Sequence, residues 1–240
     1  MSFYRKLATS DHWFATSVRA VRRALMNFSV PAPGVIVRPM LLLFVTARQV
    51  WFALYRVCIC EPLFKAYCRT YGHNLHTGNF IHWVQGKGDI ILGDNVLIDG
   101  KCNFAFAVRY SPNPTFRMGN NSGLGHGCIL TIGKQISIGN DCRLAPFVTV
   151  FDSPGHPLDP VLRRSGAPAN TEDVRPVTIC DNVWIGSGAV IFPGVTIGEN
   201  SVVSSGAYVM SDVPPNTVVA GNPARKVMSL TAKEQAPVAV

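Results

Sequence analysis

The stretch FDSPGHPLDP, residues 151–160, concentrates polar and turn-forming residues in an otherwise apolar region. His156 stands between Gly155 and Pro157. A neutral imidazole can remove the proton of a hydroxyl that lies within hydrogen-bond reach, although a lone histidine in a loop is more commonly a surface residue. Asp152 either orients the imidazole or binds a substrate, or it caps its own turn, as aspartate often does. This stretch alone does not decide between a functional and a structural role for either His156 or Asp152.

The elements that position this stretch repeat every six residues. Such a step fits neither a lone helix, whose period is 3.6, nor a flat strand, whose period is 2. It predicts a prism-like solenoid with one short strand and one turn per hexad, in which the aliphatic residue points inward. Glycines such as Gly186 then suit the corners. The recurring residues are Leu92, Ile98 and Phe104, then Ile132, Ile138, Leu144 and Val150, then Ile179, Ile185, Ile191, Ile197, Val203 and Val209.

The repeat is interrupted twice. Residues 105–123 are poor in inward aliphatics and rich in Pro, Asn and Gly, so we expect an irregular coil or a small loop. Residues 151–176 form the larger break, because the count resumes only at VTICDNVWIG. A long excursion from a rigid repeat scaffold is typical of a functional loop.

The stretch IGSGAVIFPGVTIGENSVVSSGAYV, followed by SDVPPNTVVAGNPARKV, resembles the hexapeptide-repeat acyltransferases over about residues 79–228. LAPFVTVFDSPGHPLD and PVTICDNVWIGSGAVI are similar to the sugar O-acetyltransferase branch, which includes maltose and galactoside acetyltransferases. The resemblance implies a mainly β fold, a left-handed parallel β-helix assembled as a homotrimer. It also implies an enzyme that transfers an acetyl group from acetyl-CoA to a sugar hydroxyl, with no metal.

The same resemblance implies roles for individual residues. His156 takes the position of the catalytic base, and Trp184 and His126 take positions that face the acceptor, with Asp152 as a further acceptor-binding or orienting candidate. Coenzyme A would lie in a groove between two subunits. The residues implied for that groove and for the closing C-terminal segment are Ser187, Ser205, Gly206, Asn222, Pro223 and Arg225. Many relatives carry Thr-Lys where this chain has Met210-Ser211, so that cationic contact is not carried over.

The positive charge of the chain lies near its N-terminus. Residues 1–70 hold ten Lys/Arg and two acidic residues, a net charge of +8, whereas the remainder is balanced. Aromatic and aliphatic residues stand between those arginines, and the uncharged run between Arg38 and Arg48 is too short to span a bilayer. We therefore expect a basic amphipathic helical segment on an anionic membrane surface. A helix packed on the main domain or in a subunit interface is the alternative.

The sequence predicts three regions. Residues 1–75 form the helical, basic segment, 76–213 the solenoid, and 214–240 the segment that contacts coenzyme A and the tail. The seven scattered cysteines have no disulfide-scaffold density and no CxxC spacing, and no signal peptide is recognised. These features predict a cytoplasmic protein, peripheral on the inner face of the plasma membrane. No recognised nucleic-acid-binding motif is present.

Three other functions compete with this prediction. An N-acyltransferase of an amino sugar shares the donor chemistry. A γ-type carbonic anhydrase shares the solenoid but needs three converging zinc-binding histidines, and we expect His73, His76 and His82 to cap or pack the solenoid entrance instead. A non-catalytic scaffold predicts that no acyl-CoA binds. The membrane-directed segment favours a glycan acceptor of the cell envelope or its lipid-linked precursor.

Overall fold

The computed structural model describes residues 9–230 and divides the chain into two compact units, Met1–Gln49 and Val50–Val240. Arg5 and Lys6 of the basic segment lie outside the described residues, as does the predicted tail over residues 231–240.

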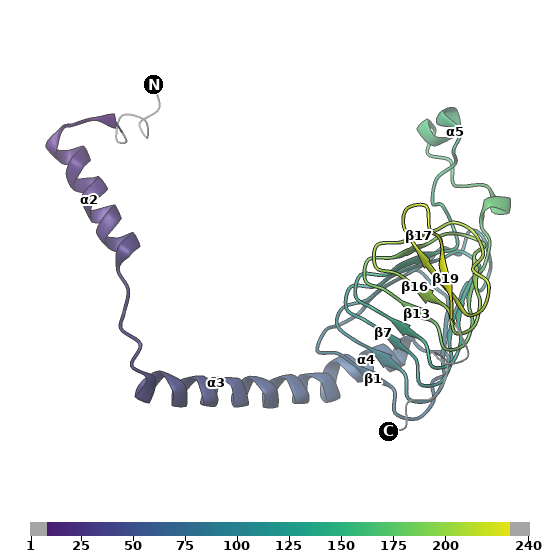
Figure 1. Cartoon of the computed structure of the whole chain (residues 1–240), viewed down its shortest axis with the longest axis horizontal. Coiled ribbons are helices and arrows are strands. Elements are labelled where there is room, and N and C mark those ends of the chain that lie inside the picture. The colour runs from purple at the N-terminus through teal and green to yellow at the C-terminus, as the bar shows by residue number, and fades with distance from the viewer. Residues whose placement is uncertain (1–8, 231–240) are drawn as a thin grey trace. The chain divides into compact units, whose positions relative to one another are not determined.

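The second unit is a solenoid of three parallel sheets (Figure 1). The chain passes from an eight-stranded to a six-stranded to a five-stranded sheet and then repeats the circuit. The eight-stranded sheet contains β1 (His76–Thr77), β4 (Leu97–Ile98), β7 (Gly123–Leu124), β10 (Arg143–Leu144), β13 (Trp184–Ile185), β16 (Val202–Val203), β18 (Thr217–Ala220) and β19 (Arg225–Ser229). The six-stranded sheet contains β2 (Trp83–Gln85), β5 (Asn103–Phe106), β8 (Ile129–Ile132), β11 (Thr149–Phe151), β14 (Val190–Ile191) and β17 (Tyr208–Val209). The five-stranded sheet contains β3 (Asp89–Leu92), β6 (Thr115–Met118), β9 (Gln135–Ile138), β12 (Val177–Ile179) and β15 (Thr196–Ile197).

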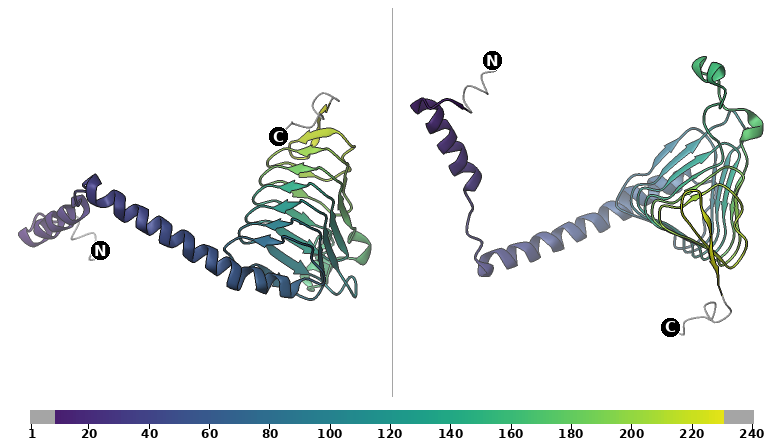
Figure 2. Two further views of the ribbon diagram at one scale, coloured as in Figure 1. Left: turned by 90° about the horizontal axis from the view of Figure 1, so that it is seen from below. Right: turned by 45° about the horizontal axis from the view of Figure 1, so that its top comes forward.

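The apolar residues at the head of each hexad, which are aliphatic except for Phe104, fill the centre of the prism and confirm the predicted repeat. All thirteen of them are buried in one continuous core. Neighbouring coils stack in register, as in the pairs Ile138 with Ile179 and Ile185 with Val203. Figure 2 shows the coils stacked along the axis and their three-sided outline. Among the described strands only the last pair, β18 with β19, is antiparallel.

The three corners of the prism have different chemistry. The asparagine corner, between the five- and eight-stranded sheets, holds Asn or Asp at positive φ in successive coils. Their amides hydrogen-bond from coil to coil, as from Asn95 to Asn121 at 2.9 Å. The glycine corner, between the eight- and six-stranded sheets, comprises residues 78–82, 99–102, 125–128, 145–148, 186–189 and 204–207. The loop corner lies between the six- and five-stranded sheets and carries both interruptions.

The first interruption is shorter than the sequence predicted. The irregular segment covers only 107–114, because β6 follows at Thr115 and pairs with β3 and β9. Phe116 and Met118 of that strand are buried. They replace the usual aliphatics as inward residues, so the part of the prediction that extended the irregular coil over 115–118 was wrong.

One continuous helix leads into the solenoid. It consists of α3 (Gly34–Tyr55), a π-helical turn η1 (Arg56–Cys60) and α4 (Glu61–Tyr67). Phe64 of α4 is buried, with its ring 5.6 Å from that of Phe104 in the first coils. By length and composition the helix Gly34–Tyr67 could cross a membrane, and none of its apolar window is buried. The uncharged run between Arg38 and Arg48 is short by itself, whereas the whole helix stays apolar overall despite its arginines.

The first unit contains the helix α2 (Trp13–Asn27). The His12 side chain caps its N-terminus by accepting a hydrogen bond from the N–H of Phe14. Large apolar side chains of α2 are exposed along one side, where they line a shallow groove with Ser17 and Arg22. The apolar members of that lining are Trp13, Phe14, Val18, Val21, Leu25 and Met26. The helix carries three arginines and no acidic residue.

Candidate active site

The predicted catalytic loop leaves the solenoid at the loop corner and stands away from its wall (Figure 1). After β11 the chain forms the short helix α5 (Pro160–Arg164), then the 3-10 turn η2 (Thr171–Asp173), and rejoins the wall at β12. Asp159 caps α5, with hydrogen bonds from two backbone N–H groups. The base of the loop is closed by the Arg175 N–H, which donates to the Asp152 carbonyl at 2.9 Å.

His156 lies near the start of this loop with an exposed side chain. Gly155 before it has φ +80°, and Pro157 after it is buried, so the backbone on both sides is restrained. Within residues 9–230 its imidazole makes no hydrogen bond or ion pair. Both ring nitrogens are therefore free to exchange a proton with a substrate, as a general base requires.

Asp152 is fully buried at the loop corner. Its carboxylate accepts hydrogen bonds from the backbone N–H groups of Gly133, Lys134 and Gln135 at 2.6, 2.6 and 2.7 Å. Burial raises the pKa of Asp152, and the three N–H donors oppose that shift. The carboxylate thus caps the turn of the preceding coil, not its own turn, and no hydrogen bond joins it to His156.

The glycine corner gathers most of the residues predicted to bind coenzyme A and the acceptor. His126, Ser187 and Ser205 follow one another there, in line with the axis. The N–H of Gly206 donates to the Ser187 carbonyl at 2.9 Å, and the Ser187 hydroxyl donates to the Pro146 carbonyl at 2.7 Å. Ser187 and Ser205 are exposed. In the described chain their own backbone N–H groups make no hydrogen bond, so they can donate to a ligand.

The C-terminal segment continues the same corner. Asn222 and Pro223, joined by a cis peptide bond, are exposed in the turn between β18 and β19. This turn is fixed against β17, because the Tyr208 N–H donates to the Gly221 carbonyl at 3.0 Å. Arg225, which is also exposed, lines with Lys226 a pocket of about 360 Å³ at the end of the solenoid.

Trp184 lies beside this corner, on the outer face of the eight-stranded sheet. Its side chain is 58% exposed and stands in register with Arg143 and Val202 on the neighbouring strands. His156, by contrast, belongs to the loop corner. No hydrogen bond or ring contact in the described chain joins His156 to Trp184 or to the glycine corner. One chain therefore gathers the predicted donor residues with Trp184 and His126, but His156 and Asp152 lie apart from them at the loop corner.

Two phenylalanines at the glycine corner were missed from the sequence. The ring of His126 lies between those of Phe80 and Phe147, with centroids 5.6 and 5.7 Å away. Phe147 has φ +63°. The signal was available in the hexads, because LAPFVT places phenylalanine at the step where GLGHGC, IGSGAV and VSSGAY have glycine.

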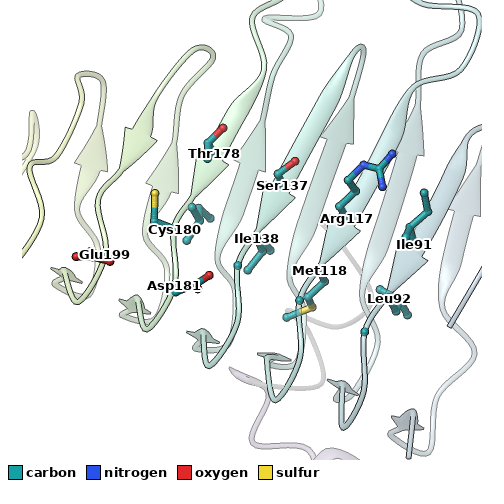
Figure 3. Close-up of a pocket in the computed structure, with 14 residues that line it drawn as sticks. Ile91, Leu92, Arg117, Met118, Ser137, Ile138, Thr178, Cys180, Asp181 and Glu199 are labelled. Atoms are coloured by element: carbon teal, nitrogen blue, oxygen red, sulfur yellow. The ribbon is translucent and has the colours of Figure 1, made fainter. Parts of the chain in front are cut away.

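A groove of about 650 Å³ runs along the outer face of the five-stranded sheet. Arg117, Ser137 and Thr178 project into it from β6, β9 and β12 in register, and Asp181 and Glu199 lie near one end (Figure 3). None of the predicted site residues lines this groove. It is on a different face from the glycine corner and is not part of the candidate active site.

The histidines near the solenoid entrance have structural contacts, as expected. His73 lies 3.3 Å from a carboxylate oxygen of Asp94, and His76 lies 3.5 Å from one of Glu61. His82 is buried, with its ring 4.6 Å from that of Phe64. Among residues 9–230 no group of three His, Cys, Asp or Glu side chains is placed to hold a metal ion.

The structure is a hexapeptide-repeat solenoid with an exposed histidine, His156, in its longest loop among the described residues. Residues 176–210 match the family model for the bacterial transferase hexapeptide (six repeats). The chain is 33% identical over 141 residues to nodulation protein L of Rhizobium meliloti, which covers 59% of this chain and 70% of that protein. The chain belongs to the bacterial hexapeptide transferase family.

Two further relatives carry names that describe an activity. Galactoside O-acetyltransferase of Escherichia coli is 37% identical over 128 residues, which is 53% of this chain and 61% of that enzyme. The chain thus spans less than two thirds of that relative's length. A galactoside acetyltransferase solved in complex with coenzyme A is 26% identical, with a TM-score of 0.50 over 98% of this chain and 94% of that one.

A second solved structure supports the fold alone. It is a mutant of AntD, an N-acyltransferase from Bacillus cereus in complex with dTDP and coenzyme A, at 22% identity and a TM-score of 0.58. The match covers 72% of this chain and 90% of that one.

Proposed function

We propose that the protein transfers an acetyl group from acetyl-CoA to a hydroxyl of a sugar, with His156 as general base. The observation that carries the proposal is the imidazole of His156, which is exposed and unpaired in the described part of the chain. It stands in the long excursion of a solenoid whose named relatives include galactoside O-acetyltransferases. The thioester is already activated, so the enzyme needs to activate only the hydroxyl.

The reaction follows from these groups by direct transfer. A free ring nitrogen of His156 takes the hydroxyl proton as the hydroxyl oxygen forms a bond to the thioester carbonyl carbon. The carbon–sulfur bond then breaks, and the imidazolium returns its proton to the departing thiolate. Backbone N–H groups such as those of Ser187 and Ser205 can stabilise the oxyanion. Within the described chain no nucleophile–base pair argues for a covalent enzyme intermediate.

The glycine corner fits coenzyme A. A Cβ atom at Gly188 or Gly206 would meet no other atom within 4 Å, so the surface there is open to a pantetheine arm. Farther along the same edge, Arg225 and Lys226 provide positive charge for the phosphates. We therefore assign Ser187, Ser205, Gly206, Asn222, Pro223 and Arg225 to the donor side of the site.

We further propose a homotrimer in which the loop of one subunit reaches the glycine corner of its neighbour. The support is the separation of the two sets of residues. His156 belongs to the loop corner, whereas Trp184 and Ser187 lie at or beside the glycine corner of the same prism. A rotationally symmetric assembly can supply each site with both sets.

The acceptor that we propose is a glycan at an anionic membrane, such as a lipid-linked precursor of an envelope or extracellular polysaccharide. Helix α2 supports this part because it exposes an apolar side and carries Arg19, Arg22 and Arg23 without an acidic residue. Such a helix binds in the interface of an anionic bilayer. The expected location is the inner face of the plasma membrane, with the enzyme in the cytoplasm.

The decisive experiment measures thiol release from acetyl-CoA against a panel of nucleotide sugars, methyl glycosides and glycan fragments. We expect turnover with a hydroxyl acceptor and an O-acetylated product by mass spectrometry, and in His156→Ala a turnover that is lower by roughly 10²- to 10⁴-fold. Turnover restricted to amino sugars would instead favour N-acylation. Undiminished turnover in His156→Ala would overturn the mechanism, and absence of acyl-CoA binding would favour a scaffold.

A further inference from the structure

Phe147 has an unusual backbone conformation for its residue type. Eight residues other than glycine have positive φ in the described chain, and Phe147 is the only one that is neither Asn nor Asp. The left-handed region is sterically disfavoured for a bulky side chain, whereas Asn and Asp tolerate it. Such outliers persist where the surrounding structure enforces them, and they are enriched at functional sites.

The same corner step is glycine in the neighbouring coils. Phe147 corresponds to Gly127, Gly188 and Gly206, whose φ values are +74°, +69° and +69°. The hydrogen-bond ladder confirms this register, because the Phe147 N–H donates to the His126 carbonyl just as the Gly206 N–H donates to the Ser187 carbonyl. The solenoid itself therefore does not require a phenyl ring at this step.

The ring of Phe147 is directed toward the preceding coil. It lies over Gly127, where a Cβ atom would come within 2.5 Å of the phenyl Cδ1. From there it meets the His126 ring edge-to-face, at 84°, and His126 meets Phe80 in the same way at 64°. Phe147 and Phe80 stay 60% and 49% exposed, so the corner presents two open aromatic rings.

His126 adds a polar group between those rings. The Lys101 N–H donates to Nδ1 of His126 at 3.2 Å, so the neutral imidazole carries its proton on Nε2. In the described chain Nε2 has no hydrogen-bond partner. The ring approaches the backbone closely at Gly100, where a Cβ atom would clash with Nδ1 at 2.1 Å. A donor of fixed orientation thus stands between two exposed phenyl rings.

We propose that Phe147, His126 and Phe80 form the subsite that holds the sugar ring of the acceptor. The apolar C–H face of a pyranose would stack on Phe147, and one of its hydroxyls would accept a hydrogen bond from Nε2 of His126. Pockets for small ligands combine apolar or aromatic walls with a few placed polar groups in this way. The proposal rests on the proposed function, since it names the acceptor side of that site.

The position along the corner distinguishes the sugar from the donor. Ser187 and Ser205, assigned to the donor, follow Phe147 along the axis, whereas His126 and Phe80 precede it. Ser187 contacts the residue next to Phe147, because its hydroxyl donates to the Pro146 carbonyl. Phe147 therefore lies where a sugar on one side and a thioester on the other would meet.

The test compares Phe147→Asn and Phe147→Tyr with the wild type, using the methyl glycosides and nucleotide sugars that the wild type acetylates. Asn tolerates positive φ but removes the ring, so we expect KM for the sugar to rise roughly tenfold. KM for acetyl-CoA should stay within about twofold and the melting temperature should stay equal or rise. Phe147→Tyr keeps the ring and should retain the wild-type KM for the sugar.

Three results would overturn the subsite. They are an unchanged sugar KM in Phe147→Asn, an equal rise of both KM values, and dissociation of the oligomer in light scattering, which would make Phe147 a subunit contact. Failure of the proposed function is distinguishable, because then the wild type itself releases no thiol with any acceptor. In that case the proposed sugar subsite is also rejected, because it depends on the proposed function.

Discussion

One carboxylate oxygen of Asp152 accepts a hydrogen bond from the Gly133 N–H at 2.6 Å, across two successive coils of the loop corner. Two more N–H groups, those of Lys134 and Gln135, bond to the other oxygen. Asp152 is also the first residue after β11, and its carbonyl accepts from Arg175 where the chain returns. The same residue thus closes the base of the excursion that carries His156 and fixes it to the preceding coil.

Removing this carboxylate should destabilise the fold. Asp152→Ala leaves three N–H groups without their acceptor, and two of their residues are partly or fully buried. We expect a loss of at least about 3 kcal/mol in the free energy of unfolding, measured by urea denaturation. Asp152→Asn keeps one oxygen acceptor and should lose less. A fall in kcat without any loss of stability would contradict this structural role and favour orientation of His156.

Removing the imidazole of His156 should lower kcat and leave the stability of the fold unchanged. Because the side chain is exposed and unpaired, His156→Ala should leave the melting temperature unchanged. We expect kcat to fall roughly 10²- to 10⁴-fold, the usual contribution of a general base. His73→Ala is the matched control, since His73 is another exposed histidine, beside Asp94 at the solenoid entrance. Comparable losses in the two variants would contradict a specific role.

The sequence predicts the stacked coils well because each coil repeats the same six-residue pattern of inward and corner positions. Ser187 and Ser205 are eighteen residues apart, three hexads, so they must share a corner. The buried column from Ile179 to Val209 follows from the same step. Asp152 could not be assigned in this way, because its partners at 133–135 belong to the preceding coil and only the folded loop brings them together.

Other features depended on the backbone conformation. The sequence marks Phe147 as an exception among glycines, but only the structure shows that it keeps positive φ and turns its ring to His126. The strand at 115–118 was missed because Phe116 and Met118, not aliphatic residues at the hexad step, fill the core there. The composition of this stretch shows that the hexad repeat is lost, but it does not show that the side chains of Phe116 and Met118 fill the core instead.

The buried histidine at the entrance should make stability depend on pH. Burial lowers the pKa of His82 from 6.5 to about 4, although nearby Asp99 acts in the opposite direction. Nδ1 accepts from the Cys102 N–H, and the buried Nε2 has no hydrogen-bond partner among residues 9–230. Between pH 6.5 and about 4 the unfolded chain binds this proton and the folded one does not. The stabilisation is therefore complete above pH 6.5 and is lost as the pH falls toward 4.

The loss should amount to on the order of 3 kcal/mol over that interval, since one pKa unit corresponds to about 1.4 kcal/mol. Denaturation of the wild type and of His82→Asn at several pH values measures it. The asparagine can still accept from the Cys102 N–H but does not titrate. Equal pH slopes in the two proteins would show that other groups cause the dependence.

Arg225, at the end of the glycine corner, should contribute to the binding of acetyl-CoA but not to the rate of acetyl transfer. Arg225→Ala removes a cation from the terminal pocket, so KM for acetyl-CoA should rise roughly tenfold while kcat stays near the wild-type value. Lys87→Ala removes another exposed cation, at the loop corner, and is the control. If the two variants behave alike, Arg225 acts only through the net charge of the protein.

Helix α2 gives the sharpest test of membrane attachment. Val21 lies in the middle of the exposed apolar lining, whereas Thr16 is not part of that lining. Val21→Glu and Thr16→Glu therefore add the same charge to the same helix on different sides. We expect the wild type and Thr16→Glu to float with vesicles that contain phosphatidylglycerol, and Val21→Glu to float at least roughly fivefold less.

Vesicles of phosphatidylcholine alone, and high salt, should weaken the flotation, because α2 carries three arginines and no acidic residue. Equal flotation of the two glutamate variants would exclude the apolar side of α2 as the attachment. Flotation that is insensitive to both lipid charge and salt would point to insertion of the apolar helix Gly34–Tyr67, which is long enough to cross the bilayer.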